Sequence, residues 1–413
     1  MQLKLYNTQT KKQQIIDRNT QKKILVYSCG PTVYKEVHIG NLRAYVFADT
    51  LNRALRFCGH QVEHVINITD VGHLTDDADA GEDKIEKQAQ QEGRSATEIA
   101  QTNTNLFFTD LLKLHIAKDR YRFPRATDYI QEQITLIQKL ESKGFTYETE
   151  DGIYFDTGAY PAYGALGLSL ADDENTHARV TTTTQKKSPH DFALWKKTPT
   201  GTTRQQEWQS PWGTGFPGWH IECSAMVMSI LSETIDIHTG GMDHIAIHHN
   251  NEIAQSEAAT EKTFARLWMH TAFLTEKNEK LSKSKGTAHT LTDIETMGYR
   301  PTALRYLFLQ SSYKTPLSFS FQALQSAQTA LERLEQEYRS LPHSLLSRCN
   351  TKKSTKYVQQ INEAVIDDLN TAAVLALVWN IVHDTEITPI IKRNTIRYAD
   401  RVLGLLDLSL IHI

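Results

Sequence analysis

Four residues of types that bind zinc stand out in the sequence: Cys29, Cys223, His248 and Glu252. His248 and Glu252 are four positions apart, so on a helix their side chains lie within about 40° of each other. His249 would point about 100° away and is not expected to share a metal easily with that pair. A histidine and a carboxylate at this spacing can bind a metal, although isolated pairs of this kind more often lie on an ordinary polar helix face.

The two cysteines could complete a metal site. Cys29 ends a predicted buried strand, and Cys223 precedes another predicted strand that leads to His248. If these two α/β halves pair, both thiols can converge on His248 and Glu252 at the carboxyl edge of a parallel sheet. Two thiols, one imidazole and one carboxylate are a chemically suitable zinc set.

Two further motifs suit a triphosphate. HIGN, at His38–Asn41, opens a predicted helix directly after a strand and loop. The free N–H groups of a helix N-terminus favour phosphate, and Gly40 permits a close approach. KLSKSKG, at Lys280–Gly286, places two lysines three apart in a Ser/Gly-rich loop, which suits a mobile clamp on a polyphosphate. Together the two motifs indicate the two sides of one ATP site.

The elements that position these residues follow an α/β pattern. Lys23–Cys29 is apolar and β-rich, and Asn41–Phe57 has apolar residues at helical spacing. Val62–Ile68 is a second strand candidate. Strand, helix and strand in this order predict a parallel α/β unit with its ligand crevice at the carboxyl ends of the strands.

Other segments are assigned more coarsely. The patterns predict helix within 95–143 and 247–260, short strands at 152–156, 179–184 and 235–238, and amphipathic helices from 321 onward with breaks near 342 and 389. The middle region interrupts the α/β pattern and is interpreted as an inserted subdomain.

Composition limits the class of protein. The 413 residues have a net charge of −3, which excludes a globally basic nucleic-acid binder but not a local basic surface. The four cysteines form no CxxC pair, which fits a reducing cytosol. The longest apolar run, 372–379, is too short to span a bilayer.

The chain resembles the cysteinyl-tRNA synthetases, a family of class I aminoacyl-tRNA synthetases. The matching segments lie in the family's order between about residues 5 and 320 and include YSCGPTVYKEVHIGNLRAYV, NITDVG, KKSPHDFALWK, SPWGTGFPGWHIECSAM, DIHTGGMD, HHNNEIAQSEA and EKLSKSKG. The resemblance implies a Rossmann-like catalytic domain with a parallel sheet, split by a connective insertion and followed by a C-terminal α-helical bundle. Expected units are 1–120 and 211–265 for the two catalytic halves, 121–210 for the insertion, 266–320 for a stem-contact region with the KLSKS loop, and 321–413 for the bundle.

The resemblance also implies roles for individual residues. It implies one zinc ion held by Cys29, Cys223, His248 and Glu252. It implies ATP with Mg²⁺ held by His38, Gly40, Asn41, Gly240, Asp243, Lys280 and Lys283, of which His38, Asn41, Lys280 and Lys283 act in catalysis. The amino acid should be bordered by Thr69, Trp219 and His238. The implied reaction joins L-cysteine to tRNA-Cys in the cytoplasm, with the enzyme a monomer away from membranes.

Two departures from the family are visible. The family pattern HHENE reads HHNNE here, so Asn250 replaces a glutamate while both presumed ligands remain. Family members usually carry a small anticodon-binding domain after the bundle, whereas this sequence stops at LGLLDLSLIHI, so either the protein lacks that domain or the sequence is truncated. The sequence leaves two alternative functions open. One is a cysteine ligase of the mycothiol-pathway type, which joins cysteine to an amino sugar, and the other is a non-catalytic paralogue that binds nucleotide or RNA.

Overall fold

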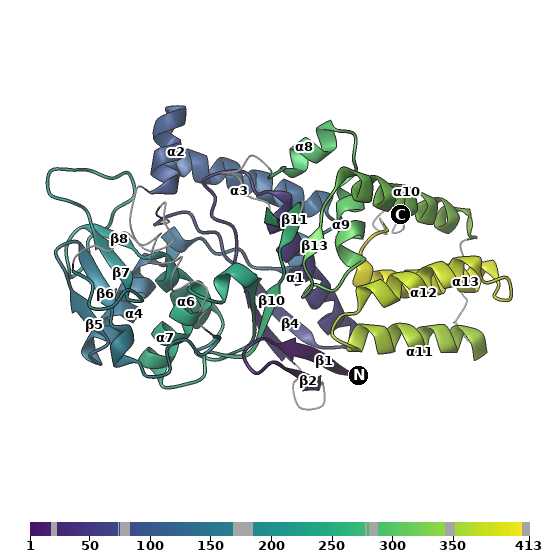
Figure 1. Cartoon of the computed structure of the whole chain (residues 1–413), viewed down its shortest axis with the longest axis horizontal. Coiled ribbons are helices and arrows are strands. Elements are labelled where there is room, and N and C mark those ends of the chain that lie inside the picture. The colour runs from purple at the N-terminus through teal and green to yellow at the C-terminus, as the bar shows by residue number, and fades with distance from the viewer. Residues whose placement is uncertain are drawn as a thin grey trace.

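The computed structural model describes residues 1–17, 23–72, 74, 83–167, 185–276, 279–280, 288–342 and 352–406, of which 276, 279–280 and 352–353 are described by backbone alone. The molecule is elongated, with an insertion at one end, a parallel sheet in the middle and helices at the other end (Figure 1). The predicted strand at 179–184 lies outside the described residues. No described helix combines the length and the apolarity needed to cross a bilayer.

The central sheet has the strand order β10-β9-β3-β4, and all neighbours are parallel. Its members are β3 (Lys23–Ser28), β4 (Gln61–Ile66), β9 (Ile235–Gly241) and β10 (Ala265–Thr271). The strands predicted at 23–29, 62–68 and 235–238 are confirmed in β3, β4 and β9. Because β9 pairs directly with β3, the carboxyl ends of two strands more than 200 positions apart lie side by side.

Helix α1 (Ile39–Phe57) connects β3 to β4 and confirms the predicted strand–helix–strand unit. Its apolar side chains recur at helical spacing and are buried, Leu42, Val46 and Leu55 among them. The helix ends before Gly59, whose φ of 92° is readily adopted by glycine.

The insertion contains α4 (Ile130–Ser142) and an antiparallel sheet in the order β5-β6-β7-β8. These strands are β5 (Thr146–Glu148), β6 (Gly152–Phe155), β7 (Phe192–Lys197) and β8 (Gly215–Pro217). The strand predicted at 152–156 is confirmed in β6. Since β8 lies beyond residue 210, this sheet includes residues on both sides of the expected boundary, and the domain limits stay a prediction.

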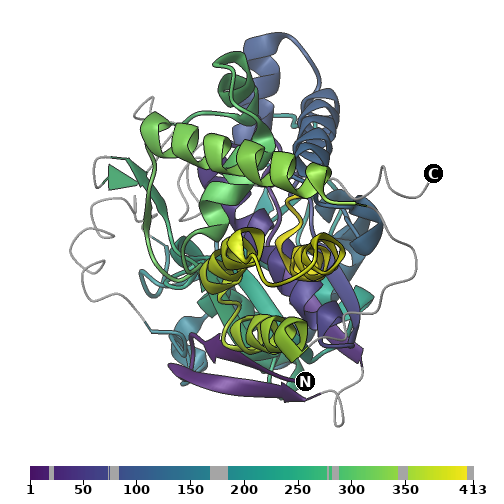
Figure 2. The ribbon, with the colours of Figure 1, turned by 90° about the vertical axis from the view of Figure 1, so that its right-hand side faces the viewer.

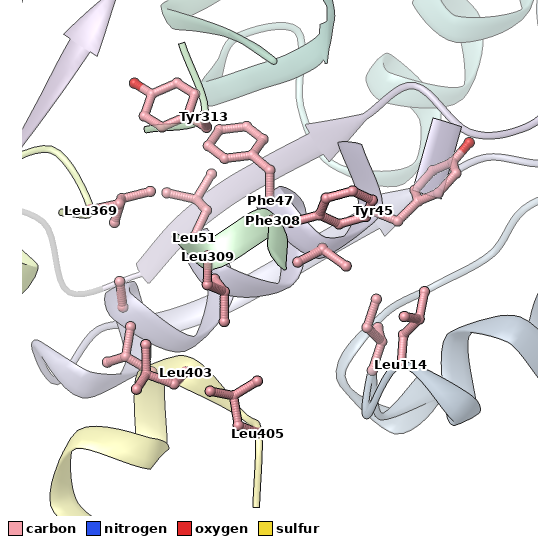
Figure 3. Close-up of a cluster of buried hydrophobic side chains, with 14 of the residues drawn as sticks. Tyr45, Phe47, Leu51, Leu114, Phe308, Leu309, Tyr313, Leu369, Leu403 and Leu405 are labelled. Carbon is pink, nitrogen blue, oxygen red and sulfur yellow. The ribbon is translucent and has the colours of Figure 1, made fainter. Parts of the chain in front are cut away.

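Long helices form the C-terminal end, as the amphipathic pattern predicts. They are α10 (Phe321–Ser340), α11 (Lys352–Ile366), α12 (Thr371–His383) and α13 (Pro389–Leu403). Viewed from that end, α11, α12 and α13 stand in front of α1 (Figure 2). One apolar core joins them to the sheet, as the close-up of Leu51, Phe308 and Leu403 illustrates (Figure 3).

Further helices, turns and short strands complete the described structure. They are the hairpin β1 (Gln2–Asn7) and β2 (Lys12–Asp17), the helices α2 (Lys84–Glu92), α3 (Ala96–Lys113), α6 (Trp219–Ile230), α7 (His248–Thr260), α8 (Leu291–Thr296) and α9 (Pro301–Leu309), the 3₁₀ turns η1 (Lys118–Arg120), η2 (Ala126–Tyr129), η3 (Thr157–Ala159) and η4 (Met242–His244), and the strands β11 (Leu274–Glu276), β12 (Glu279–Lys280) and β13 (Leu317–Ser318). The helix expected at 247–260 is confirmed in α7, and that within 95–143 is divided between α3 and α4.

Candidate metal centre and nucleotide site

The structure brings the four predicted metal ligands together. Cys29 directly follows β3, Cys223 lies in α6, and His248 and Glu252 lie one turn apart in α7. One ligand atom from each residue lies within 4.8 Å of the ligand atoms of the other three. Three elements from distant parts of the chain therefore present these atoms to one point.

The segments that follow β3 and β4 approach each other closely beside Cys29. A Cβ atom at Gly30 would lie 1.5 Å from the backbone oxygen of Asn67, so only glycine fits there. The Asn67 side chain accepts a hydrogen bond of 2.7 Å from the Gly30 N–H. This contact joins the segments that follow β3 and β4, and it holds the backbone that carries Cys29.

Glu252 is the centre of a buried polar network. Its carboxylate lies 2.9 Å from His248 Nε2 and 2.8 Å from His238 Nε2, and the Cys29 thiol donates to it over 3.7 Å. Glu252 and His238 are completely buried. Each carboxylate oxygen therefore has an imidazole partner, which satisfies the requirement that a buried charge be paired.

His249 also lies beside the cluster, although no possible ligand set among the described residues contains both His248 and His249. His249 Nε2 lies 3.2 Å from Cys29 Sγ, and a second set of possible ligands consists of Cys29, His238, His249 and Glu252. Helix geometry alone does separate His249 from His248. Cys29, however, approaches α7 from the sheet and can contact the neighbouring face as well.

Two further histidines belong to the surroundings and were not singled out from the sequence. His220 Nδ1 lies 2.8 Å from His248 Nδ1, and His270 Nε2 lies 2.7 Å from His249 Nδ1. The GWHIEC segment contains His220, so its position two residues after Gly218 was an available signal. His270 lies in β10, and nothing local in its sequence distinguishes it from an ordinary strand residue.

The electrostatics of the cluster favour the ionised forms of Cys223 and Glu252. The hydrogen bond from the Cys29 thiol, followed by the interaction with His248, lowers the pKa of Cys223 to about 6 despite burial. Burial raises the pKa of Cys29 instead. Although burial opposes it, the charges of His238 and His248 hold the pKa of Glu252 well below its usual range. The thiolate of Cys223 and the carboxylate of Glu252 thus lie near the rings of His238 and His248.

The donor set fits zinc. Zinc binds sulfur at about 2.3 Å and imidazole nitrogen at about 2.0 Å, so two ligands of one tetrahedral ion lie about 3–4 Å apart. The four ligand atoms lie within 4.8 Å of one another and are buried or half-buried, which requires only small inward movements. Burial of two thiols, an imidazole and a carboxylate at one point has a clear chemical purpose when a cation neutralises them.

The HIGN motif, which is predicted to bind phosphate, lies at the N-terminus of α1. His38 is the N-cap, and its Nδ1 accepts hydrogen bonds from the backbone N–H of Gly40 (3.1 Å) and Asn41 (3.3 Å). The Asn41 side chain accepts from the His38 N–H at 3.4 Å. This reciprocal cap fixes the ring, and because Nδ1 accepts, the proton of the neutral imidazole sits on Nε2.

The residues predicted to border the amino acid lie in or next to the elements that carry the candidate metal ligands. Trp219 begins α6 and its ring lies 4.3 Å from that of His248, centroid to centroid. Thr69 follows β4 and is buried, and its Oγ1 accepts a hydrogen bond of 3.1 Å from Asn67. His238 lies in β9 with its ring stacked on Trp268. Trp219 and His238 therefore contact candidate metal ligands, and Thr69 lies at the same edge of the sheet.

The other residues predicted to bind the nucleotide are Gly240, Asp243, Lys280 and Lys283. Gly240 has no room for a Cβ, which would meet His249 and His244 at 2.7–2.8 Å. Asp243 is exposed in the turn that follows. Lys280 lies in the backbone of β12, whereas Lys283 lies outside the described residues.

Residues 15–329 match the family model described as the tRNA synthetases class I (C) catalytic domain. Cysteine–tRNA ligase 1 of Burkholderia lata is 44% identical over 98% of this chain and 84% of its own length, and the cysteine–tRNA ligase of Treponema denticola is 39% identical over 98% and 86%.

Solved structures support the same fold. A Mycobacterium tuberculosis methionyl-tRNA synthetase in complex with methionyl-adenylate aligns with a TM-score of 0.61 at 14% identity, over 93% of this chain and 90% of that one. An Agrobacterium radiobacter leucyl-tRNA synthetase aligns with a TM-score of 0.64 at 11% identity, over 93% and 83%. The parallel sheet, the family model and the relatives that match over 98% of this chain agree, and the chain belongs to the cysteine–tRNA ligase family of class I aminoacyl-tRNA synthetases.

Proposed function

We propose that this chain activates L-cysteine with ATP and transfers the cysteinyl group to the 3′ end of tRNA-Cys. The observation that carries the proposal is the meeting of Cys29, Cys223, His248 and Glu252 at the sheet edge from which α1 also begins. A sulfur-selective site beside a helix N-terminus suits the joint recognition of a thiol amino acid and a nucleotide. Membership of the cysteine–tRNA ligase family supports it.

In the first step a carboxylate oxygen of cysteine attacks the α-phosphorus of ATP. The new oxygen–phosphorus bond replaces the bond to the β-phosphate, and pyrophosphate leaves with the electron pair. A carboxylate is already a nucleophile at neutral pH, so the chain needs to align groups and neutralise charge. We assign Nε2–H of His38 and the N-terminus of α1 to the phosphate oxygens, with Mg²⁺, Lys280 and Lys283 on the departing pyrophosphate.

In the second step the 2′-hydroxyl of the terminal ribose attacks the cysteinyl carbonyl and forms an ester bond. AMP leaves with the electron pair of the broken carbon–oxygen bond, and the hydroxyl proton passes to its phosphate. We assign Asn41, Gly40, Gly240 and Asp243 to binding of the nucleotide during both steps. Thr69, Trp219 and His238 would border the amino acid. Gly240 would keep the backbone of β9 accessible, because any larger residue would displace two histidines.

We assign Cys29, Cys223, His248 and Glu252 as the ligands of one zinc ion. When bound, zinc supplies a direct bond to a thiolate sulfur, an interaction that the hydroxyl of serine cannot match. An apolar pocket would distinguish substrates that differ in one group by only about 10–200-fold. In this proposal the chain's own residues hold the ion and orient the amino acid, and the bond chemistry occurs at the HIGN side. We further propose that the enzyme works as a monomer in the cytoplasm, where charged tRNA is consumed.

The test measures ATP–pyrophosphate exchange with cysteine and with serine, and then aminoacylation of tRNA-Cys, with zinc content determined on the same preparation. We expect exchange that depends on cysteine, one zinc per chain, and a large loss of both in Cys223→Ala. A Cys58→Ala variant is the matched control, because Cys58 is a buried thiol outside the cluster. Retention of zinc and of cysteine preference by Cys223→Ala would contradict the metal assignment, and transfer to an amino sugar instead of tRNA would contradict the substrate assignment.

A further inference from the structure

A groove lies at the far end of α1, where the sheet domain meets the C-terminal helices. It has a volume of about 780 Å³ and is lined by the end of α1, the end of α3, η1 and α13. A second cavity of about 330 Å³ shares two of its lining residues, Arg56 and Arg120. The two hollows are therefore neighbours along one surface, and that shared boundary is basic.

Three arginines in this groove have no carboxylate partner within 4.0 Å among the described residues: Arg56, Arg120 and Arg401. In contrast, the neighbouring Arg53 is paired with Asp49 at 2.6 Å, and Lys113 with Glu295. The uncompensated positive charge thus comes from three separate elements, and it converges on one surface of a chain whose total charge is −3.

Two of these guanidinium groups are held in position by neutral contacts. Arg56 donates from Nε to the Asn52 side chain (2.8 Å) and from Nη2 to the backbone oxygen of Val62 (3.0 Å). Arg401 lies over the rings of Phe57 and Tyr398, at 5.1 and 5.6 Å from their centroids. A guanidinium ordered in this way keeps its charge and loses less entropy when it binds a phosphate.

Several lysines that lie close together in the sequence are ion-paired in the fold. Lys187, Lys196 and Lys197 each lie within 2.8 Å of a carboxylate. These three lysines are therefore poorer candidates for binding an anion than the groove arginines.

We propose that this groove binds the phosphate backbone of the tRNA body. The proposal rests on the proposed function, which makes tRNA a substrate. Helix α1 has 19 residues and is about 28 Å long, so the groove is separated by that length from His38 at the other end of the helix. An RNA whose 3′ end reaches His38 must extend well beyond its last nucleotides to reach Arg120 and Arg401, and two adjoining hollows suit an extended phosphate chain rather than a single small anion.

The experiment compares binding of uncharged, labelled tRNA-Cys to the full chain and to an Arg120→Gln/Arg401→Gln variant by fluorescence anisotropy over a series of salt concentrations. We expect about tenfold weaker binding and a salt dependence reduced by about one to two released ions. The control variant, Lys187→Gln/Lys197→Gln, removes the same charge from residues that are already ion-paired and should bind like the wild type.

Cysteine-dependent ATP–pyrophosphate exchange, which needs no tRNA, should be unchanged in the arginine variant. If exchange persists and tRNA affinity and salt slope equal those of the wild type, the groove proposal is overturned while the proposed function stands. If the wild type shows no cysteine-dependent exchange but the arginine variant binds tRNA more weakly, the proposed function fails and the groove is still an RNA site. An Arg120→Lys/Arg401→Lys variant should recover most of the affinity, and failure to do so together with a lowered thermal midpoint would attribute the loss to damaged structure and contradict the proposal.

Discussion

The guanidinium of Arg305 lies 2.6 Å from the carboxylate of Asp49, and neither side chain is exposed to solvent. Asp49 also accepts from Arg53 on its own helix. Although burial raises it, the charges of Arg305 and Arg53 lower the pKa of Asp49 below its ordinary value. Arg305 donates further to the backbone oxygens of Leu403 and Leu114, so one side chain joins α9, α1, α13 and the end of α3.

Replacing this arginine should strongly destabilise the fold. Arg305→Met leaves Asp49 with Arg53 as its remaining cationic partner and exposes two carbonyl groups to an apolar surrounding, so we expect a loss of about 3–5 kcal/mol in the free energy of unfolding. Denaturant unfolding monitored by circular dichroism measures the change. The exposed Arg339→Met is the control and should change stability by less than about 1 kcal/mol. A small effect at Arg305 would mean that the buried pair contributes little.

The two overlapping ligand sets can be distinguished by single histidine variants. We expect His248→Ala to lose most of its zinc under dialysis against a weak chelator, and His249→Ala to retain it, because His248 completes the set with both cysteines. Zinc is measured by atomic spectroscopy on protein that has been shown to be folded. Retention by the first variant and loss by the second would assign the ion to the set that contains His238.

The two functions of His38 can also be separated. Asparagine is a good N-cap residue, so His38→Asn should keep α1 intact while removing the Nε2 donor. We expect about 10²-fold slower cysteine-dependent pyrophosphate exchange, the order found on removal of one transition-state hydrogen-bond donor, with an unchanged thermal midpoint. His38→Ala should lose both exchange and about 1 kcal/mol of stability. Equal exchange rates in His38→Asn and the wild type would show that the ring acts only as a cap.

Asp110 predicts a pH effect on stability. Its carboxyl is 3% exposed, and one oxygen has no hydrogen-bond partner among the described residues. Burial, with the nearby charge of Glu36, raises the pKa of Asp110 to about 7. The native chain therefore keeps this proton between about pH 4 and 7 while the unfolded chain releases it, so this residue lowers stability as the pH rises through that range.

The variant Asp110→Asn should remove that penalty. We expect it to be about 1–3 kcal/mol more stable than the wild type at pH 8 and to show little difference at pH 4, as measured by denaturant unfolding at both pH values. The exposed Asp128→Asn is the control and should show no such dependence. A pH-independent difference for Asp110→Asn would indicate a packing effect instead of a titration.

Local patterns in the sequence predicted β3, β4 and β9 of the central sheet but not β10. β3, α1, β4 and β9 have apolar residues at strand or helix spacing with clear end signals, and the observed bounds lie within a few residues of the expected ones. Helix α6 was not recognised, because its residues are apolar on nearly all sides and give no amphipathic signal. The short strands β7 and β8 were also missed. They are strands because they pair with distant segments of the insertion, and a local pattern does not reveal that pairing.

The sequence by itself determined the chemistry that this protein can offer. Residue type and motif identified two thiols, an imidazole and a carboxylate for a metal and the HIGN turn for phosphate, because side-chain chemistry and helix periodicity are local properties. Only the tertiary structure decided how these groups share space. The parallel pairing of β3 with β9 brings Cys29 to α7, where Cys29 lies near His249 as well as His248. The periodicity of one helix cannot reveal this contact. Likewise, lysines that form clusters in the sequence are paired in the fold, whereas the arginines of the groove converge from distant elements because α1 and α13 pack together.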